Sequence, residues 1–326
     1  MKYLYVLVGS KNGFYCEQTL VSIASLKNVQ PEAFVTLLVD CQTDKDFVPE
    51  LERIKKYVSE YIVVPVEKSV HPIAKSRYIK TSMRKYVQGD FLYVDADTVW
   101  NAPIDETDFT HDVMGVLDGH SLLTVHPLKK EIEEDFKKVG CNPGVERYVN
   151  GGVLFSRDSD VSKNFFDLWH KNWLETSKSK YFIDMPSLNC AIEKIGDAFA
   201  LLPDVYNVQV SRSWEFFFDA KIIHFFTGWQ NEYFESPYVF QKKEFWNEIR
   251  EKGLSESVYA KITKPLAAFE KTLGVYGNSE KEFRQTALYG FLADIYSKRN
   301  EKKTFYFLEK MMVKLSKSLG RTKASS

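Results

Sequence analysis

Two carboxylates one residue apart follow a hydrophobic run in the segment FLYVDADTVW, residues 91–100. Asp95 and Asp97 would repel each other at such short range unless a cation lies between them. The apolar residues before them predict a buried strand, so both carboxylates are expected at its carboxyl end, where α/β sheets bind ligands. The pattern predicts a metal site. The remaining alternative is a turn in which the two aspartates accept hydrogen bonds from nearby backbone amides.

The same Asp-x-Asp spacing occurs twice more, at Asp44 and Asp46 and at Asp158 and Asp160. Each of these pairs comes just before a segment with helical periodicity. Aspartate is a preferred residue at a helix N-cap, where its carboxylate accepts a hydrogen bond from a backbone amide. We therefore predict N-caps at these two pairs and a metal site only at the pair in residues 91–100.

Strand and helix patterns alternate in the first hundred residues. They predict strands at 3–9, 33–41, 61–66 and 90–97, separated by helices at 16–28, 46–58 and 76–87. Near-continuous apolar strands that alternate with helices are typical of a parallel sheet covered on both faces. The expected fold is therefore α/β: a doubly wound, mostly parallel sheet with a Rossmann-like nucleotide-binding half.

The second half continues this pattern as far as about residue 240. It contains a two-glycine turn that enters a strand (147–159), a helix with an apolar core stripe (165–175), a helix that begins after Asp184, and strand-like segments at 198–210 and 220–229. His224 lies in the last of these. The following residues are helix-like, and this change of pattern predicts two domains, 1–238 and 239–326.

The segment 302–326 has the pattern of a basic amphipathic helix. Its apolar face comprises Phe305, Leu308, Met312 and Leu315, with lysines and an arginine around it. Such a helix can lie on an anionic membrane surface, which predicts peripheral contact with the inner membrane leaflet. The alternative is a C-terminal helix that packs on its own domain.

Composition excludes several classes of function. Lys plus Arg and Asp plus Glu both total 44, so the formal net charge is zero and no overall field attracts nucleic acid. No apolar run approaches the length of a membrane span. The four cysteines are scattered, which predicts a reducing compartment without a cysteine-based zinc site. We expect a cytoplasmic protein.

The order of the motifs resembles that of the family 8 retaining glycosyltransferases, which include glycogenin and bacterial lipopolysaccharide galactosyl- and glucosyltransferases. The resemblance covers residues 3–235 and rests on six segments in the family's order: AKSRYIK (74–80), YVDAD (93–97), VNGGVLF (149–155), DMPSLN (184–189), LLPDVYN (201–207) and IIHFFTG (222–228). It implies the GT-A fold and a metal-dependent transfer of a hexose from a nucleotide sugar, a UDP-hexose, to a glycan or lipid-linked acceptor.

The resemblance also implies a role for individual residues. Asp95, Asp97 and His224 would bind Mn²⁺ or Mg²⁺, and a histidine ligand favours Mn²⁺. Asp184 and Asn150 would be catalytic residues beside the sugar. The implied contacts to the donor are Gly9, Ser10, Tyr15, Arg77, Asp95, Ala96, Gly151 and Gly228.

Two positions depart from the family pattern and leave other functions open. Met185 stands where the galactosyltransferases have glutamine, and no lysine follows Gly228. A transferase fold that binds nucleotide sugars without catalysis is therefore one alternative. A sugar-phosphate nucleotidyltransferase is another, although the segment after the first strand lacks the arginine-rich loop expected for that class.

Overall fold

The computed structural model describes residues 1–67, 71–141, 146–226, 236–269, 278–297, 307 and 310–315. The chain forms two compact units: residues 1–227 with 239–269, and residues 228–238 with 270–326. Residues 239–269 thus lie in the first unit. The predicted domain boundary after residue 238 stays a prediction.

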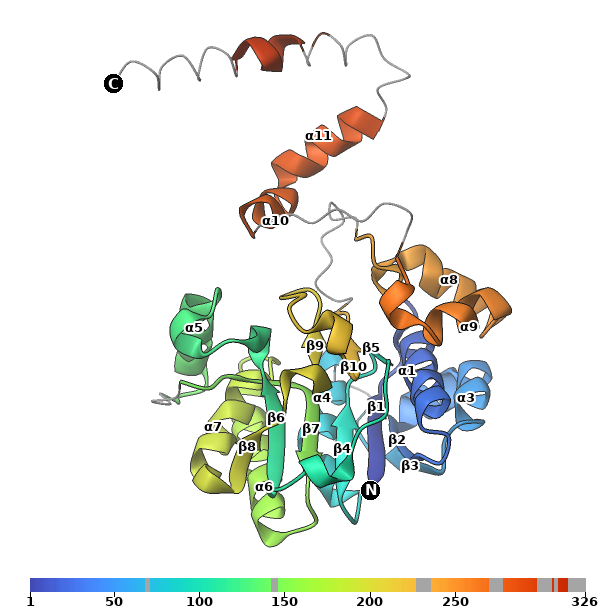
Figure 1. Cartoon of the computed structure of the whole chain (residues 1–326). Coiled ribbons are helices and arrows are strands. Elements are labelled where there is room, and N and C mark those ends of the chain that lie inside the picture. The colour runs from blue at the N-terminus through green and yellow to red at the C-terminus, as the bar shows by residue number, and fades with distance from the viewer. Residues whose placement is uncertain are drawn as a thin grey trace. The chain divides into compact units, whose positions relative to one another are not determined.

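A seven-stranded sheet forms the centre of the first unit (Figure 1). Its strands are β1 (Lys2–Leu7), β2 (Phe34–Asp40), β3 (Glu60–Val64), β4 (Phe91–Val94), β6 (Val113–Leu117), β7 (Val149–Ser156) and β8 (Phe199–Leu201). Their spatial order is β3-β2-β1-β4-β7-β6-β8, and every pairing is parallel except the two that β7 makes. The predicted fold class is confirmed.

Helices connect the strands. The first unit contains α1 (Tyr15–Val29), α2 (Cys41–Asp46), α3 (Val48–Lys55), α4 (Pro72–Ser82), α5 (Lys129–Lys138), α6 (Asp160–Ser177), α7 (Met185–Ile195), α8 (Lys243–Lys252) and α9 (Glu256–Ile262). Right-handed crossovers place α1 and α4 on opposite faces of the sheet, because α1 leads from β1 to β2 and α4 leads back from β3 to β4. The second unit contains α10 (Asn278–Arg284) and α11 (Ala287–Ser297).

The core stripe predicted in the segment 165–175 is confirmed. Phe165 and Trp169 of α6 are fully buried and pack in one hydrophobic cluster with residues of the sheet, α4 and α7, and Trp173 is also buried. The helix predicted at 46–58 is instead divided between α2 and α3. The second helix has a proline, Pro49, in its first turn, where the missing N–H costs no hydrogen bond.

A smaller sheet lies beside the carboxyl end of β4. It contains β5 (Thr98–Trp100), β10 (Ile222–His224) and β9 (Val208–Gln209), with β10 antiparallel to β5 and parallel to β9. His224 pairs with Thr98, and the Phe225 amide donates to the Asp97 carbonyl at 3.0 Å. This pairing brings a histidine 127 residues further along the chain to the Asp95–Asp97 segment.

The predicted N-caps were wrong in position. The cap of α2 is Asp40, whose carboxylate accepts from the Gln42 and Thr43 amides, while Asp44 accepts from the Tyr61 hydroxyl. The cap of α6 is Ser159, and Asp158 accepts instead from the Gly89 amide. In each case the capping residue has extended backbone, as a cap requires.

The two-glycine turn is also corrected, because Gly151 and Gly152 lie inside β7. The pairing of β7 with β6 changes register opposite Gly115 and Val116, so the glycines lie at an irregularity within the sheet. Glycine in a strand often marks such a site, where another group approaches the backbone closely.

The scattered spacing of the cysteines predicted a reducing compartment, but two of the four cysteines form a disulfide. A disulfide joins Cys141, beyond the end of α5, to Cys190 of α7, and Cys16 and Cys41 are free thiols. Because 49 residues separate the bonded pair, no local motif indicates it. The compartment stays a prediction.

Of the predicted basic helix 302–326, residues 307 and 310–315 are described, and they are helical. Met312 and Leu315 of its apolar face are exposed. Phe305 and Leu308 lie outside the described residues, so contact with a membrane stays a prediction. Within the described ranges, no helix has the length and apolar character needed to cross a bilayer.

Candidate active site

Three predicted metal ligands meet at the carboxyl end of β4. One potential ligand atom each from Asp95, Asp97 and His224 lie within 4.8 Å of one another. Two ligands of one divalent cation lie at most about twice the metal–ligand distance apart, which is about 4 to 5 Å. The spacing and the mixed oxygen and nitrogen donors therefore fit a single divalent ion.

Asp97 and His224 are in direct contact. The imidazole Nε2 lies 3.1 Å from Asp97 Oδ1, and the His224 side chain is only 2% exposed. Burial alone would raise the pKa of the Asp97 carboxyl, but the charge and hydrogen bond of His224 outweigh it and hold this pKa below its ordinary value. Asp97 is therefore an ionised oxygen donor.

Asp95 contacts a buried cation that the sequence analysis did not identify. Lys80 Nζ lies 3.0 and 3.1 Å from the two carboxylate oxygens of Asp95, and the Tyr93 hydroxyl donates to the same carboxylate. Burial, followed by the negative charge of Asp95, raises the pKa of Tyr93 well above its ordinary value, so the phenol keeps its proton. These donors fix the position of Asp95 and partly neutralise it.

Asp184 belongs to the same constellation. It is the residue before the first turn of α7, but its carboxylate caps no amide there. Oδ1 pairs with Arg77 Nε at 2.9 Å, and Oδ2 lies 3.7 Å from Lys80 Nζ. Oδ2 is buried and has no hydrogen-bond partner among the described residues. Such an oxygen has an unused acceptor position for a hydrogen bond.

Arg77 and Lys80 occupy one side of α4 because residues three positions apart are neighbours on a helix surface. Both point to carboxylates that are distant in sequence. The charge of Asp184 raises the pKa of Arg77, against the effect of burial, so its guanidinium remains a cation. The i, i+3 spacing in AKSRYIK was the sequence signal that could have identified Lys80.

The glycines of β7 fit around the site. A Cβ on Gly152 would lie 2.3 Å from His224 Cε1, so only glycine leaves space for the imidazole. A Cβ on Gly151 would meet Lys80 Nζ at 3.5 Å, which is an ordinary contact. The Gly152 carbonyl also accepts from the Asp95 amide at 2.7 Å. β7 thus contacts two of the predicted metal ligands, Asp95 and His224.

Asn150 is buried and contacts protein groups. Its Nδ2 donates to Asp118 Oδ1 at 2.8 Å, while its Oδ1 accepts from the Gly152 amide and from Asn207 Nδ2. Asp118 and Asn207 were not identified as site residues from the sequence, although Asn207 ends the segment LLPDVYN. The catalytic role of Asn150 stays a prediction.

The predicted contacts after β1 lie at the same edge of the sheet as Asp95, because β1 and β4 are parallel neighbours. The Gly9 amide donates to Thr43 Oγ1, and a Cβ there would lie 2.6 Å from the Phe47 ring. Ser10 lines a cavity of about 250 Å³ with residues of α1 and α8. Tyr15 begins α1 and is 47% exposed. Gly228 lies outside the described residues.

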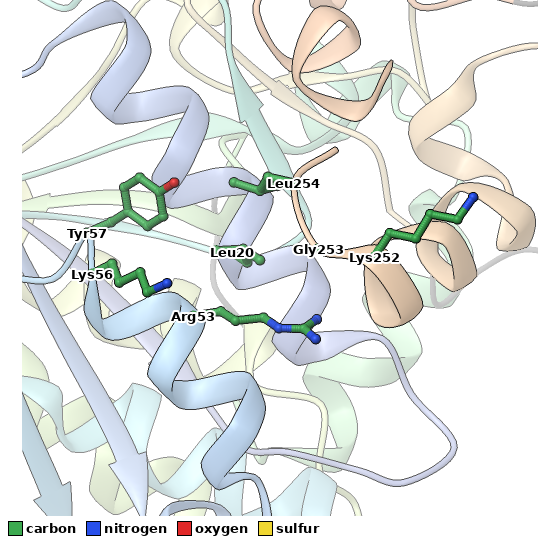
Figure 2. A pocket seen from close by; sticks show the side chains of 7 residues that line it. All are labelled: Leu20, Arg53, Lys56, Tyr57, Lys252, Gly253 and Leu254. Atoms are coloured by element: carbon green, nitrogen blue, oxygen red, sulfur yellow. The ribbon is translucent and has the colours of Figure 1, made fainter. Parts of the chain in front are cut away.

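A second hollow of about 260 Å³ lies between α1, α3 and the turn after α8 (Figure 2). None of the predicted site residues lines it. One of its three cationic side chains, Arg53, donates to the carbonyls of Ile249 and Arg250 near the end of α8. A basic side chain at a helix C-terminus satisfies carbonyls that lack a partner within the helix, which is a structural role.

No protein-family model and no curated protein sequence matches this chain. Among solved structures, it is similar to galactosyltransferase LgtC in complex with donor and acceptor sugar analogues, with a TM-score of 0.50 and 12% identity over 87% of this chain and 100% of LgtC. An active-site mutant of LgtC gives the same TM-score and identity over 99% of its chain. At this identity the likeness shows the fold: the first unit has the GT-A architecture of glycosyltransferases.

Proposed function

We propose that this chain is a metal-dependent glycosyltransferase that moves a hexose from a nucleotide sugar, a UDP-hexose, to a glycan or lipid-linked acceptor with retention. The observation that carries the proposal is the meeting of Asp95, Asp97 and His224 at one point on the carboxyl edge of the sheet. The structure of LgtC with donor and acceptor sugar analogues supports the substrate class. Retention rests on the family 8 resemblance.

Asp95, Asp97 and His224 would hold the cation, and their mixed donor set suits Mn²⁺, with Mg²⁺ as the second choice. When bound, a divalent cation would compensate the negative charge that builds up on a diphosphate leaving group. Lys80 leaves part of the Asp95 carboxylate free, because two carboxylate oxygens offer about four acceptor positions. Lys80 also adds a fixed positive charge on the side of Asp184.

Asp184 would contact the transferred sugar. Its Oδ1 is held by Arg77. Its Oδ2, which lies 3.7 Å from Lys80 Nζ without a hydrogen bond, would accept a hydrogen bond from a sugar hydroxyl or face the positive charge that develops at the anomeric carbon. Asn150 and Gly151 would line the sugar from β7. Gly9, Ser10 and Tyr15 would hold the nucleotide at the end of β1, and Ala96 would present its backbone between the two ligand aspartates.

The test is calorimetric titration of the full chain with UDP-, GDP-, ADP- and CMP-sugars, each with Mn²⁺ and with a chelator. The proposal predicts that a UDP-hexose binds with Mn²⁺ and that the chelator removes the binding. Incubation of that donor with the protein should then release UDP, either by transfer or by slow hydrolysis. Absence of binding by every donor in the presence of Mn²⁺ would contradict the proposal.

One observation favours a second candidate, a nucleotide-sugar-binding module without catalysis. Lys80 contacts both oxygens of Asp95 and so supplies part of the positive charge that a metal would provide. Met185 adds a thioether where a polar side chain is expected. This candidate predicts donor binding that persists in the chelator and no release of UDP, so the same titration separates the two functions.

The acceptor would be a cell-surface glycan or a lipid-linked sugar, and nucleic acid is not expected as a partner of a chain with zero formal charge. We place the enzyme in the cytoplasm, with peripheral contact to the inner membrane surface through the basic segment 302–326. Co-sedimentation with vesicles of anionic and of neutral lipid, for the full chain and a chain ending at residue 301, tests this placement.

A further inference from the structure

The segment that leads from β1 into α1 holds three of the proposed donor contacts: Gly9, Ser10 and Tyr15, the last of which begins the helix. Residues 8–14 form a loop that belongs to neither element, so the sheet and the helix fix only its two ends. Within the loop, the Gly13 amide donates to the Ser10 carbonyl at 3.1 Å, which closes a turn. Contacts from elsewhere in the molecule therefore decide where this turn lies.

Arg250, in the last turn of α8, supplies such contacts at three neighbouring points. Its Cζ atom lies 4.5 Å from the centroid of the Phe14 ring, and its Nη2 donates to the Gly13 carbonyl. Nε and Nη2 also lie 2.6 and 3.2 Å from the two carboxylate oxygens of Glu17, in the first turn of α1. A planar guanidinium can make these contacts together, because its donors have a fixed fork geometry.

Glu17 keeps Arg250 in this place. The Glu17 side chain is only 5% exposed, and a buried carboxylate is costly unless a cation and hydrogen bonds compensate its charge. The hydrogen bond from Glu17 raises the pKa of Arg250, so the guanidinium keeps its charge. The pair therefore has a reason to stay formed, and while it is formed the same guanidinium holds the Gly13 carbonyl.

The helix that carries Arg250 is itself fixed. Trp246 of α8 is 1% exposed and stacks on the Phe225 ring, with 5.4 Å between the ring centroids. At the end of the helix, Arg53 of α3 donates to the carbonyls of Ile249 and Arg250. α8 is thus attached to the small sheet on one side and to α3 on the other, so it offers a fixed base for the loop.

We propose that Arg250 is a positioning residue that holds the loop between β1 and α1 in the conformation that binds the nucleotide of the donor. The inference rests on the proposed function. Arg250 acts through Gly13 and Phe14, which lie between the proposed contacts Ser10 and Tyr15 in the chain. The donor site would thereby include a residue of α8, which lies beyond the residues 3–235 that carry the family resemblance.

Hydrogen exchange of the full chain, without metal or nucleotide, tests whether Arg250 anchors the loop. Arg250→Met removes the donor to Gly13, and we expect the amides of residues 10–15 to exchange about 10-fold faster. Lys252→Met is the matched control, because Lys252 belongs to the same helix turn but lines the other hollow. It should leave these rates within about twofold. Equal rates in the two variants would overturn the inference.

Calorimetric titration in Mn²⁺ with UDP and with pyrophosphate tests the link to the nucleotide. UDP carries the nucleoside that the loop would hold, whereas pyrophosphate carries only the phosphates. Arg250→Met should lower the affinity for UDP about 10-fold and leave that for pyrophosphate within about twofold. An unchanged affinity for UDP, or an equal fall for both ligands, would overturn the inference.

A double variant separates positioning from the loss of stability. Arg250→Met alone leaves the Glu17 carboxylate buried without its partner, so it should unfold at lower urea concentration. Arg250→Met with Glu17→Leu removes both charges and should recover most of the stability of the wild type. Its affinity for UDP should stay low, because the Gly13 carbonyl still lacks its donor. Recovery of UDP affinity together with stability would overturn the inference.

The outcomes also distinguish this inference from the proposed function. A wild-type protein that binds no UDP in Mn²⁺ would contradict the proposed function, and the exchange rates would still show whether Arg250 anchors the loop. A wild-type protein that binds UDP, together with an Arg250→Met variant that binds it equally well, would leave the proposed function intact and overturn the role of Arg250.

Discussion

Two Asp-x-Asp pairs in this molecule each face a lysine, and they differ in almost everything else. Asp95 and Asp97 follow a buried strand, and their lysine partner, Lys80, is 4% exposed. Asp158 and Asp160 flank the cap of α6, and their partner, Lys163, is 56% exposed. The same residue types at the same spacing thus form a candidate metal site in one place and a solvated helix start in the other.

The difference shows that burial determines how much an ion pair contributes to the free energy of unfolding. An exposed ion pair contributes about 0–1 kcal/mol, because water solvates each partner almost as well. Around Asp95, the buried Lys80 and the neighbouring Arg77 face the carboxylates of Asp95 and Asp184, and removal of one partner leaves charges without compensation. The following predictions compare the two environments directly.

The largest expected effect is the loss of the buried lysine. Lys80→Met leaves Asp95 and Asp184 near each other without their shared cation, and we expect the free energy of unfolding to fall by about 3 kcal/mol in chelator. Lys163→Met at the exposed pair is the matched control and should change it by less than about 0.5 kcal/mol. Urea unfolding of the two variants measures both, and similar losses would show that burial does not distinguish the pairs.

The second effect compares two buried histidines. His224 faces a carboxylate, whereas His170 faces the Thr81 hydroxyl at 2.8 Å. Burial, then the positive charge of Lys85, lowers the pKa of His170 from 6.5 to about 4. The unfolded chain therefore binds more protons between these values, so stability is full above pH 6.5 and falls as the pH decreases toward 4, by up to about 3 kcal/mol.

His170→Gln should remove this contribution. Urea unfolding of the wild type and the variant at about pH 7 and about pH 4.5 gives the loss of stability for each protein, and the loss should be smaller in the variant by about 2 kcal/mol. Equal losses in the two proteins would mean that His170 does not titrate differently in the folded state.

A smaller effect is expected from the glycines of β7. Gly152→Ala places a methyl group against the His224 ring, and we expect Mn²⁺ affinity to fall about 10-fold, which is about 1.4 kcal/mol. Gly151→Ala, one position earlier, meets only ordinary contacts and should leave the affinity within about twofold. Calorimetric titration with Mn²⁺ compares them. If Gly151→Ala is the weaker binder, the ring is not held by Gly152.

Much of the fold could be predicted because its signals are local. Continuous apolar strands and intervening helices indicate a parallel sheet without reference to distant residues, and the strand before Asp95 places that carboxylate at the ligand-binding edge. The exact N-caps could not be predicted, because other polar residues compete with each of them: Gln42, Thr43 and Asp44 follow Asp40, and Ser159 lies between Asp158 and Asp160. Only the backbone conformation of Asp40 and Ser159 selects them.

The site residues that the sequence analysis did not identify are defined by their contacts with residues far away in the sequence. A lysine on a helix predicts a solvated face, and only the fold shows that Lys80 points at carboxylates 15 and 104 residues further along the chain. Asn207 lies in an irregular segment, and its side chain contacts Asn150 and His224. For Lys80 the sequence offers only its i, i+3 spacing from Arg77, which does not reveal the carboxylates that it contacts.

The most direct measurement of the central claim is the binding of a UDP-sugar with Mn²⁺ to four single variants of the full chain. Asp95→Asn and Asp97→Asn remove a ligand from the proposed metal site, whereas Asp44→Asn and Asp158→Asn change aspartates of the same spacing elsewhere. The account predicts that the first two lose Mn²⁺-dependent binding and the last two keep it. If all four variants bind alike, Asp95 and Asp97 do not hold the metal.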